Sequence, residues 1–283
     1  MIQVLYNSSA NNGQGFESAK KIEVTFPKQK FEYVDVLKEA SYDELFKRIP
    51  VTDSVVIAGG DGTLNYFVNH VSEEIIRDRV IDYLPAGTGN DFATELGVKE
   101  GQVLKNINKY LVNLPTVTVK GKKYKFINGI GYGIDGYCCE VGDELRKTST
   151  KKINYAGIAI KGILFHFKPL TAKVSIDQTS RVFKNTWLTP CMNGRYYGGG
   201  MIPTPDQQRL GEPKKLSVMV YHCKSKLTAL TVFPSIFKGE HVKHNKVVNI
   251  LTGQKVSVKF DRPCALQIDG ETISGVTEFD ATV

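Results

Sequence analysis

Short apolar runs alternate with amphipathic stretches along the first 115 residues. The runs that predict strands are 2–6, 31–36, 54–58 and 80–84. Apolar residues recur at helical spacing in 16–24, 41–49 and 63–71, and a further helix is expected to begin near Asp91. Ser41 followed by Glu44 is the pattern of a capped helix start. Strands that alternate with helices predict a parallel α/β sheet.

The pattern changes after about Leu114, where short β-rich runs separated by turn residues dominate. Two helices are expected to interrupt them, at 136–147 and 153–167. We therefore predict an α/β domain over 1–115 and a mainly antiparallel β domain over 116–283, whose extreme C-terminus is free to return to the first domain. The expected strands are 117–119, 124–127, 172–176, 181–187, 216–221, 247–250, 255–260 and 266–268.

Net charge adds a preference for anionic partners. The chain carries a formal charge of +8 and a pI of about 9.1, which favours phosphorylated ligands or an acidic membrane face. Basic residues are spread along the chain, and the densest cluster, 120–125, surrounds a turn at Gly121. That cluster is typical of a solvated hairpin, so no nucleic-acid partner is expected.

The cysteines and the apolar runs indicate a cytoplasmic protein. Five cysteines occur without a C-x-x-C pair, which argues against a disulfide framework and against a tetrahedral zinc site. The longest apolar stretch, 153–167, is shorter than the roughly 20 residues that span a bilayer. Any membrane contact is therefore expected to be peripheral.

Two glycine-rich loops carry the strongest chemical signal. Gly59, Gly60, Asp61, Gly62 and Thr63 stand between a predicted strand and a predicted helix. Glycines let the backbone approach a ligand, and the amides of such a turn and of the helix start suit phosphate oxygens. Asp61 is suited to hold Mg²⁺ beside the phosphates. A structural strand–helix turn is the alternative for this loop taken alone.

The second loop, 85–91, follows the next strand and contains Gly87, Thr88, Gly89 and Asn90. Neighbouring parallel strands place their C-terminal loops side by side, where open α/β sheets bind ligands. Thr88 and Asn90 could donate or accept neutral hydrogen bonds. The pair of loops predicts one nucleotide site.

Gly-Gly-Asp-Gly-Thr at 59–63 followed by Pro-Ala-Gly-Thr-Gly-Asn-Asp-Phe-Ala at 85–93 resembles the diacylglycerol kinase catalytic family, which includes bacterial lipid kinases and the sphingosine and ceramide kinases. The resemblance extends over nearly the whole chain. Asn7–Gly15 is similar to its first loop, although Ser8 replaces the usual proline. The segments 126–135, 193–201 and 269–271 resemble its later motifs.

The resemblance implies a phosphofructokinase-like nucleotide domain and a β-sandwich substrate domain. It implies an ATP- and Mg²⁺-dependent lipid kinase that contacts the membrane surface, with Asn7 among the nucleotide-binding residues. It also implies that Glu271 is the general base toward the lipid hydroxyl, a role that a carboxylate suits chemically. A solvated turn in Asp-Gly-Glu is the alternative for Glu271. A monomer and a homodimer both stay open.

The chain departs from the family after the segment 193–201. The usual adjacent acidic pair, often tied to a second metal ion, is absent from 205–213. A second Mg²⁺ site would therefore depend on Asp206 or Glu212 alone.

Two rival functions remain. An NAD kinase shares the Gly-Gly-Asp-Gly motif, and a non-catalytic lipid-binding or regulatory protein could use the same fold. A dinucleotide-binding pattern at 131–136 lies at the start of the β-rich half rather than in a first βαβ unit, which argues against a Rossmann site.

Overall fold

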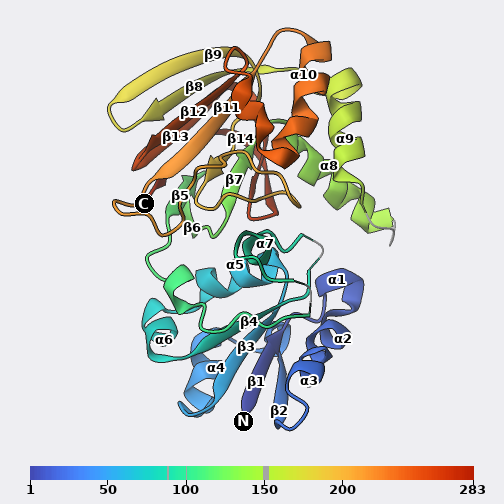
Figure 1. Cartoon of the computed structure of the whole chain (residues 1–283), viewed down its shortest axis with the longest axis vertical. Helices are drawn as coiled ribbons and strands as arrows, with labels where there is room; N and C mark the ends of the chain where they lie inside the picture. Colours follow the sequence, from blue (N-terminus) through green and yellow to red (C-terminus); the bar gives the residue numbers. More distant parts are fainter. Residues whose placement is uncertain (88, 100, 149–152) are drawn as a thin grey trace. The chain divides into compact units, whose positions relative to one another are not determined.

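The computed structural model describes residues 1–87, 89–99, 101–148 and 153–283 and divides into two compact units (Figure 1). They are Met1–Leu114 and Pro115–Val283, so the division falls one residue before the predicted boundary. The extreme C-terminus lies in the second unit, because Ala281 pairs with Val117 and the Val283 N–H donates to the Gln254 carbonyl at 3.1 Å. The prediction that left it free to return to the first domain is corrected by this pairing.

A four-stranded parallel sheet forms the centre of the first unit, as the alternating pattern predicted. Its order is β2-β1-β3-β4. The third strand reads Ser-Val-Val-Ile-Ala-Gly and is buried along almost its whole length, as expected for a strand covered on both faces. The strands are β1 (Ile2–Tyr6), β2 (Phe31–Asp35), β3 (Ser54–Gly59) and β4 (Ile81–Pro85).

Helices lie on both sides of this sheet (Figure 1). Ala19 and Ile22 pack with Val4, Val56 and Leu84 on one face. The predicted helix over 16–24 is split into two short ones. The Ser41 hydroxyl accepts the Glu44 N–H at 3.1 Å, which confirms the predicted cap. The helices are α1 (Ala10–Gly13), α2 (Gly15–Lys20), α3 (Ile22–Thr25), α4 (Tyr42–Arg48), α5 (Asp61–His70), α6 (Glu73–Asp78) and α7 (Asp91–Glu95).

The second unit is an antiparallel β-sandwich, which confirms the predicted fold class. Its hydrogen-bonded order is β6-β5-β14-β13-β7-β10-β11-β9-β8, with β12 paired to β11. The strands are β5 (Thr116–Val119), β6 (Lys122–Lys125), β7 (Gly129–Tyr132), β8 (Leu170–Ile176), β9 (Thr179–Leu188), β10 (Cys191–Met192), β11 (Leu216–His222), β12 (Val248–Gly253), β13 (Lys255–Ile268) and β14 (Glu271–Thr282).

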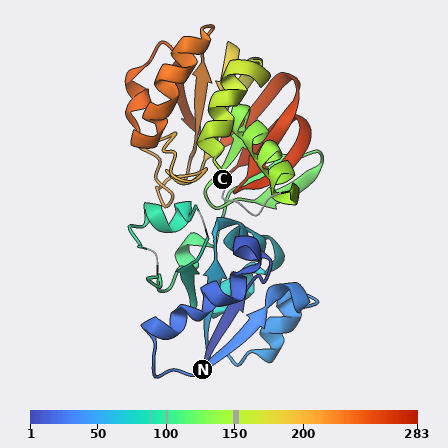
Figure 2. The same cartoon turned by 90° about the vertical axis from the view of Figure 1, so that its right-hand side faces the viewer.

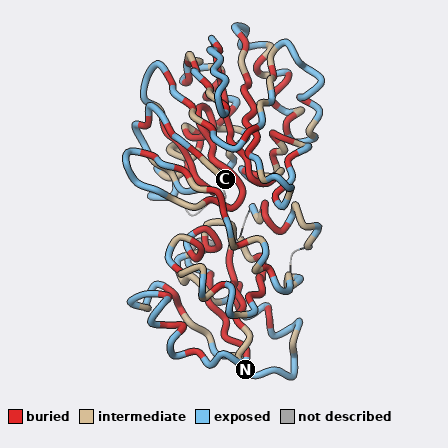
Figure 3. Tube along the Cα trace, turned by 90° about the vertical axis from the view of Figure 1, so that its left-hand side faces the viewer, coloured by how far each residue is buried: buried red, intermediate tan, exposed pale blue. Residues whose placement is uncertain are grey.

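The long strand β13 joins the two halves of this sandwich. Its first part pairs with β8 and its last part with β7, while β14 runs beside it. Figure 3 colours the buried stretches of each unit red and the exposed stretches pale blue. In the second unit, Trp187 is fully buried and donates its indole N–H to the Cys223 carbonyl at 2.9 Å. A buried aromatic with its polar atom satisfied is a stable core element.

Helices of the second unit are α8 (Ile134–Thr148), α9 (Tyr155–Lys161) and α10 (Lys226–Val232) (Figure 2). The predicted helix over 153–167 ends at Lys161 and continues as a π-turn, η3 (Gly162–His166). Two 3₁₀ turns, η4 (Phe233–Lys238) and η5 (Glu240–Lys243), follow α10. None of the helices in the described ranges is long and apolar enough to cross a membrane.

Candidate active site

The four parallel strands of the first unit end at one edge. In register, Tyr6 lies beside Asp35 and Ala58, and Gly59 lies beside Pro85. The loops that follow β1, β3 and β4 therefore leave the sheet together. These are the loops that sequence reasoning assigned to the nucleotide, and this edge is where open α/β sheets bind ligands.

Two glycines allow the loops after β3 and β4 to touch through their backbones. A Cβ added to Gly87 would lie 2.4 Å from the Gly60 Cα, and one added to Gly60 would lie 2.9 Å from the Gly87 Cα. A Cβ at Gly59 would lie 2.4 Å from the Thr63 hydroxyl oxygen, so that buried side chain packs against the loop. The glycines are needed here for close packing.

Asp61 begins α5, with Gly62 and Thr63 completing its first turn. Its carboxylate oxygens accept the backbone N–H groups of Asp91, at 2.8 Å, and of Phe92, at 3.0 Å. Asp61 therefore caps α7 and ties the two loops together. Carboxylates are also the side chains by which proteins commonly bind Mg²⁺.

Asn90 shapes the second loop from within. It adopts a left-handed conformation, with φ 48°. Its side-chain oxygen accepts the Gly87 N–H at 2.9 Å and its amide donates to the Gly87 carbonyl at 2.8 Å. Gly89 is exposed beside it. The predicted ligand Thr88 lies outside the described residues.

Asn7 follows β1 at the same edge. Its side-chain oxygen accepts the Ser9 N–H at 2.9 Å, and Asp35 accepts the Ser8 N–H at 3.2 Å. A Cβ at Gly15 would lie 1.9 Å from the Asn7 carbonyl oxygen. The first loop is thus folded tightly onto the start of α2.

Tyr83 supports the first glycine loop, a role that the sequence analysis missed because the residue stands inside an apolar strand. Its hydroxyl donates to the Gly59 carbonyl at 2.9 Å, and the ring is fully buried. Burial raises the pKa of Tyr83, and the charges of Asp61 and Asp91 raise it further. The hydroxyl therefore stays protonated and remains a donor.

In the second unit, Glu271 follows a two-residue hairpin turn between β13 and β14. Asp269 and Gly270 have φ values of 47° and 98°, and Ile268 pairs with Glu271 across the turn. Asp-Gly is the favoured pair for such a turn, so the predicted hairpin forms. Glu271 itself is exposed, which leaves its carboxylate accessible to a substrate.

Asp269 fixes that turn to the segment 127–129. Its buried carboxylate accepts the N–H groups of Ile127, at 2.5 Å, Asn128, at 2.8 Å, and Gly129, at 2.9 Å. Arg209 reaches the same segment: its guanidinium donates to the Ile127 carbonyl and, at 2.9 Å, to the Asn128 side-chain oxygen. Buried charges are tolerated where they are paired and hydrogen-bonded. Sequence reasoning missed Arg209, since nothing in 205–213 marked it as buried.

Hydroxyls next to Glu271 bond to α8. Thr272 donates to Asp143 at 2.7 Å, and Ser274 donates to Glu140 at 2.6 Å. The start of β14 is therefore fixed to α8 on one side and, through Asp269, to β7 on the other. Glu271 is presented by a rigid turn.

Asp135, at the start of α8, is a second buried carboxylate. Burial raises its pKa to about 6. Tyr197 and Gln267 lie nearby, yet within the described chain neither carboxylate oxygen meets hydrogen-bond geometry. No sequence pattern marked Asp135 as a site residue.

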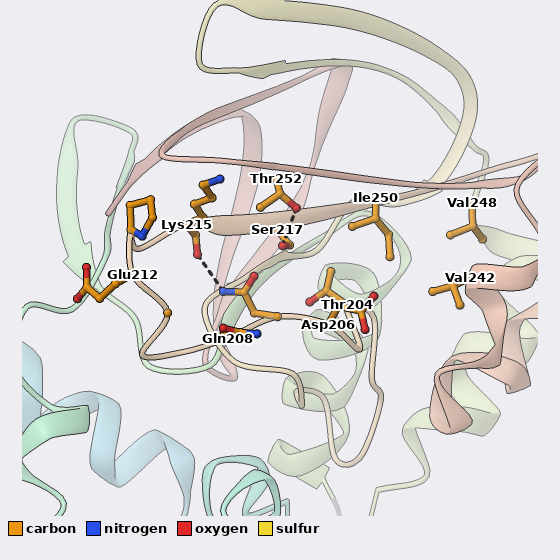
Figure 4. A pocket seen from close by; sticks show the side chains of 13 residues that line it. Thr204, Asp206, Gln208, Glu212, Lys215, Ser217, Val242, Val248, Ile250 and Thr252 are labelled. Carbon is orange, nitrogen blue, oxygen red and sulfur yellow. Dashed lines mark hydrogen bonds between the residues drawn. The ribbon is translucent and has the colours of Figure 1, made fainter.

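Asp206 and Glu212 line a pocket of about 490 Å³. In Figure 4, Asp206 lies beside Thr204, whereas Glu212 lies at the other end, beyond Lys215. The two carboxylates do not converge. No group of three or more His, Cys, Asp or Glu side chains suited to a metal occurs among the residues that the structure describes.

Comparison with known families accounts for both units. The diacylglycerol kinase catalytic domain matches residues 1–119, and the YegS C-terminal NAD kinase beta sandwich-like domain matches residues 128–280. The chain belongs to the diacylglycerol kinase family. The predicted resemblance is confirmed.

Named relatives agree with the family, and a solved structure agrees with the fold. A "Diacylglycerol kinase" of Mycobacterium tuberculosis is 28% identical over 69% of this chain and 63% of its own length, so the match leaves over a third of that relative uncovered. YtlR of Bacillus subtilis, provisionally named a lipid kinase, is 22% identical over 97% of this chain and 94% of its own. A Bacillus anthracis structure described as a diacylglycerol kinase covers 99% of this chain and 92% of its own, with a TM-score of 0.60 and 16% identity, and supports the fold.

Proposed function

We propose that the protein is an ATP- and Mg²⁺-dependent kinase that phosphorylates a hydroxyl of a diacylglycerol-like lipid. The observation that carries this proposal is the backbone contact of Gly60 with Gly87 at the carboxyl edge of the sheet, next to the first turn of α5. Family membership supplies the reaction class.

The first unit would bind the nucleotide. The first-turn amides of a helix lack intrahelical acceptors and attract phosphate oxygens. In α5 these amides belong to residues 61–63. Gly59, Gly87 and Gly89 would let the phosphates approach the backbone, with Thr88 supplying a hydroxyl. Asn7 and Asn90 would act by holding their loops, since both side chains bond to their own loop backbone.

The donor set at Asp61 fits Mg²⁺. This ion commonly uses one or two carboxylates together with substrate phosphates and water, and Asp61 supplies a carboxylate at the first turn of α5, between the two glycine loops. Mg²⁺ bound there would neutralise charge on the phosphates. Asp206 and Glu212 lie at opposite ends of their pocket and cannot bind one metal ion together. A second Mg²⁺ would therefore have a single carboxylate ligand from this pair.

The second unit would supply the base. The Glu271 carboxylate would accept the proton of the lipid hydroxyl while the hydroxyl oxygen attacks the γ-phosphorus and ADP leaves. Asp269 and the bonds of Thr272 and Ser274 would hold Glu271 in place. A lipid acceptor further implies that the protein works at a membrane surface from the cytoplasm.

An acceptor panel tests this proposal against its rivals. The purified protein is incubated with γ-labelled ATP, Mg²⁺ and either diacylglycerol in detergent micelles, sphingosine, ceramide or NAD. Label in a lipid is the expected result. Label in NAD alone would show that the protein is an NAD kinase. NAD is included because the second domain matches an NAD kinase beta sandwich-like domain. Lipid binding without any transfer would indicate a binding protein.

A further inference from the structure

Two exposed apolar side chains lie on the helix α10 and the π-turn η3, which contact each other in the second unit. Phe165 on η3 is 74% exposed and Leu227 on α10 is 73% exposed, the highest values among its described large apolar side chains. Their chain neighbours join the two elements, because the Lys226 ammonium donates to the Leu164 carbonyl at 2.6 Å. Figure 2 shows α9 and α10 on one side of this unit.

More apolar side chains extend this surface. α10 packs on η4, and η4 on η5. Ile160 on α9 is 44% exposed and Phe237 on η4 is 37% exposed. Scattered apolar side chains are ordinary on a surface, but a cluster of large ones at adjoining turns marks an interaction site. We call the exposed residues of 155–168 and 224–246 the α9–α10 surface.

Lysines outnumber acidic residues on the same two segments. They contain seven lysines against one acidic residue, Glu240, and so supply six of the eight net positive charges of the chain. Glu240 pairs with Lys243 at 3.6 Å. The other six lysines are exposed and have no carboxylate within salt-bridge distance among the described residues. These are Lys161, Lys168, Lys224, Lys226, Lys238 and Lys246.

We propose that the α9–α10 surface docks the protein on an anionic lipid bilayer. Phe165 and Leu227 would enter the interface while the lysines contact lipid phosphates, the combination of apolar and basic contacts that stable peripheral binding needs. A second copy of the chain would face six positive charges with six more. A nucleic acid would leave the apolar side chains without a partner.

The biological purpose of this surface rests on the proposed function, since a lipid kinase must reach its acceptor. The exposed apolar side chains and lysines that define the surface do not depend on that function. Docking on the α9–α10 surface would add membrane recruitment to the chemistry at Glu271. It predicts binding to anionic vesicles without ATP.

Vesicle co-sedimentation tests the surface. Wild-type protein should bind vesicles of phosphatidylglycerol and phosphatidylcholine far better than pure phosphatidylcholine. Because each lysine near an anionic surface is worth roughly fivefold in affinity, the pair Lys161→Glu and Lys224→Glu should weaken binding at least tenfold. The pair Phe165→Ser and Leu227→Ser should do the same.

Matched variants elsewhere in the unit control for surface change. Val182→Ser removes a 62% exposed side chain from β9, and Lys122→Glu with Lys123→Glu reverses charge on exposed positions of β6. Both should bind within about twofold of wild type. Equal losses in these controls, or unchanged binding of the Phe165 and Leu227 pair, would overturn the proposal. So would a change in self-association of that pair with vesicle binding intact.

Activity on a short-chain diacylglycerol in solution separates the two proposals. If the protein phosphorylates this lipid in solution and the surface variants still bind vesicles, the kinase proposal stands and the docking surface is rejected. Surface-dependent vesicle binding by a protein that transfers no phosphate to any acceptor would retain the surface and reject the kinase.

Discussion

The carboxylate of Asp61 accepts the backbone N–H of Asp91 at 2.8 Å and so joins the loop after β3 to the loop after β4. A second bond, from the Phe92 N–H at 3.0 Å, completes the cap on α7. The residue that sequence reasoning assigned to the metal therefore also holds the two glycine loops together. Its structural and chemical roles must be separated by experiment.

Removing the Asp61 carboxylate should cost stability. Bonds from backbone amides to a charged acceptor contribute about 1.5–3 kcal/mol, so Asp61→Ala should lower the free energy of unfolding by roughly 2 kcal/mol. Urea denaturation with added EDTA measures this cost without a metal. Asp43→Ala, an exposed first-turn carboxylate on α4, should change stability by less than about 0.5 kcal/mol. Equal effects of both changes would contradict the cap.

The contact between Gly60 and Gly87 should be required for nucleotide binding. In Gly87→Ala the new Cβ would lie 2.4 Å from the Gly60 Cα, so the loops must separate. We expect ATP affinity to fall at least tenfold, or about 1.4 kcal/mol, measured by calorimetry. The control is Gly97→Ala, which meets no atom within 4 Å but carries backbone strain at φ 72°. Weakened binding by the control alone would refute this role.

Arg209 should be essential to the second unit. Replacing it with methionine leaves the Ile127 carbonyl and Asn128 without their cationic donor and the buried Asp269 beside them. Loss of one partner from a buried charged network costs about 3–5 kcal/mol, so the thermal midpoint should drop by several degrees. Arg181→Met, on an exposed position of β9, serves as control. A melting temperature unchanged by Arg209→Met would show that the network is not stabilising.

The buried Asp135 should make stability depend on pH. Burial raises the pKa of Asp135 in the folded state to about 6, above its ordinary value of 3.8, so the folded state holds the proton more tightly. Stability should therefore fall as pH rises from about 4 to about 6, and then level off. Tyr197 nearby does not titrate in this range, because burial raises its pKa. Asp135→Asn should abolish this part of the dependence in urea titrations at several pH values; an identical pH profile would reject it.

The sequence predicted the parallel sheet and both glycine loops because strand periodicity and glycine spacing are local properties. The Asp-Gly-Glu turn entered the expectations only as the alternative to a catalytic role for Glu271, and the structure forms it as the hairpin between β13 and β14. The contact of Gly60 with Gly87, the cap from Asp61 to α7 and the position of Arg209 join residues 27 to 82 positions apart. Such contacts follow from tertiary packing and leave no periodic signal.

The helices of the second unit show the same limit. The stretch 153–167 reads as one apolar helix, yet α9 ends at Lys161 and a π-turn follows. The helix α10 was not predicted, although the Ser225 hydroxyl caps it by accepting the Thr228 N–H at 3.3 Å. Its seven residues are too few for a clear helical period.

The most direct test of the central claim is the rate of lipid phosphorylation by Glu271→Gln. The substitution keeps the size of an exposed side chain and removes its basicity, so a general base predicts a fall in kcat of about 10²–10⁴-fold with ATP affinity within about twofold of wild type. Glu278→Gln, an exposed position on the same strand paired with Lys259, should retain full activity. A Glu271→Gln enzyme with wild-type kcat would contradict the account.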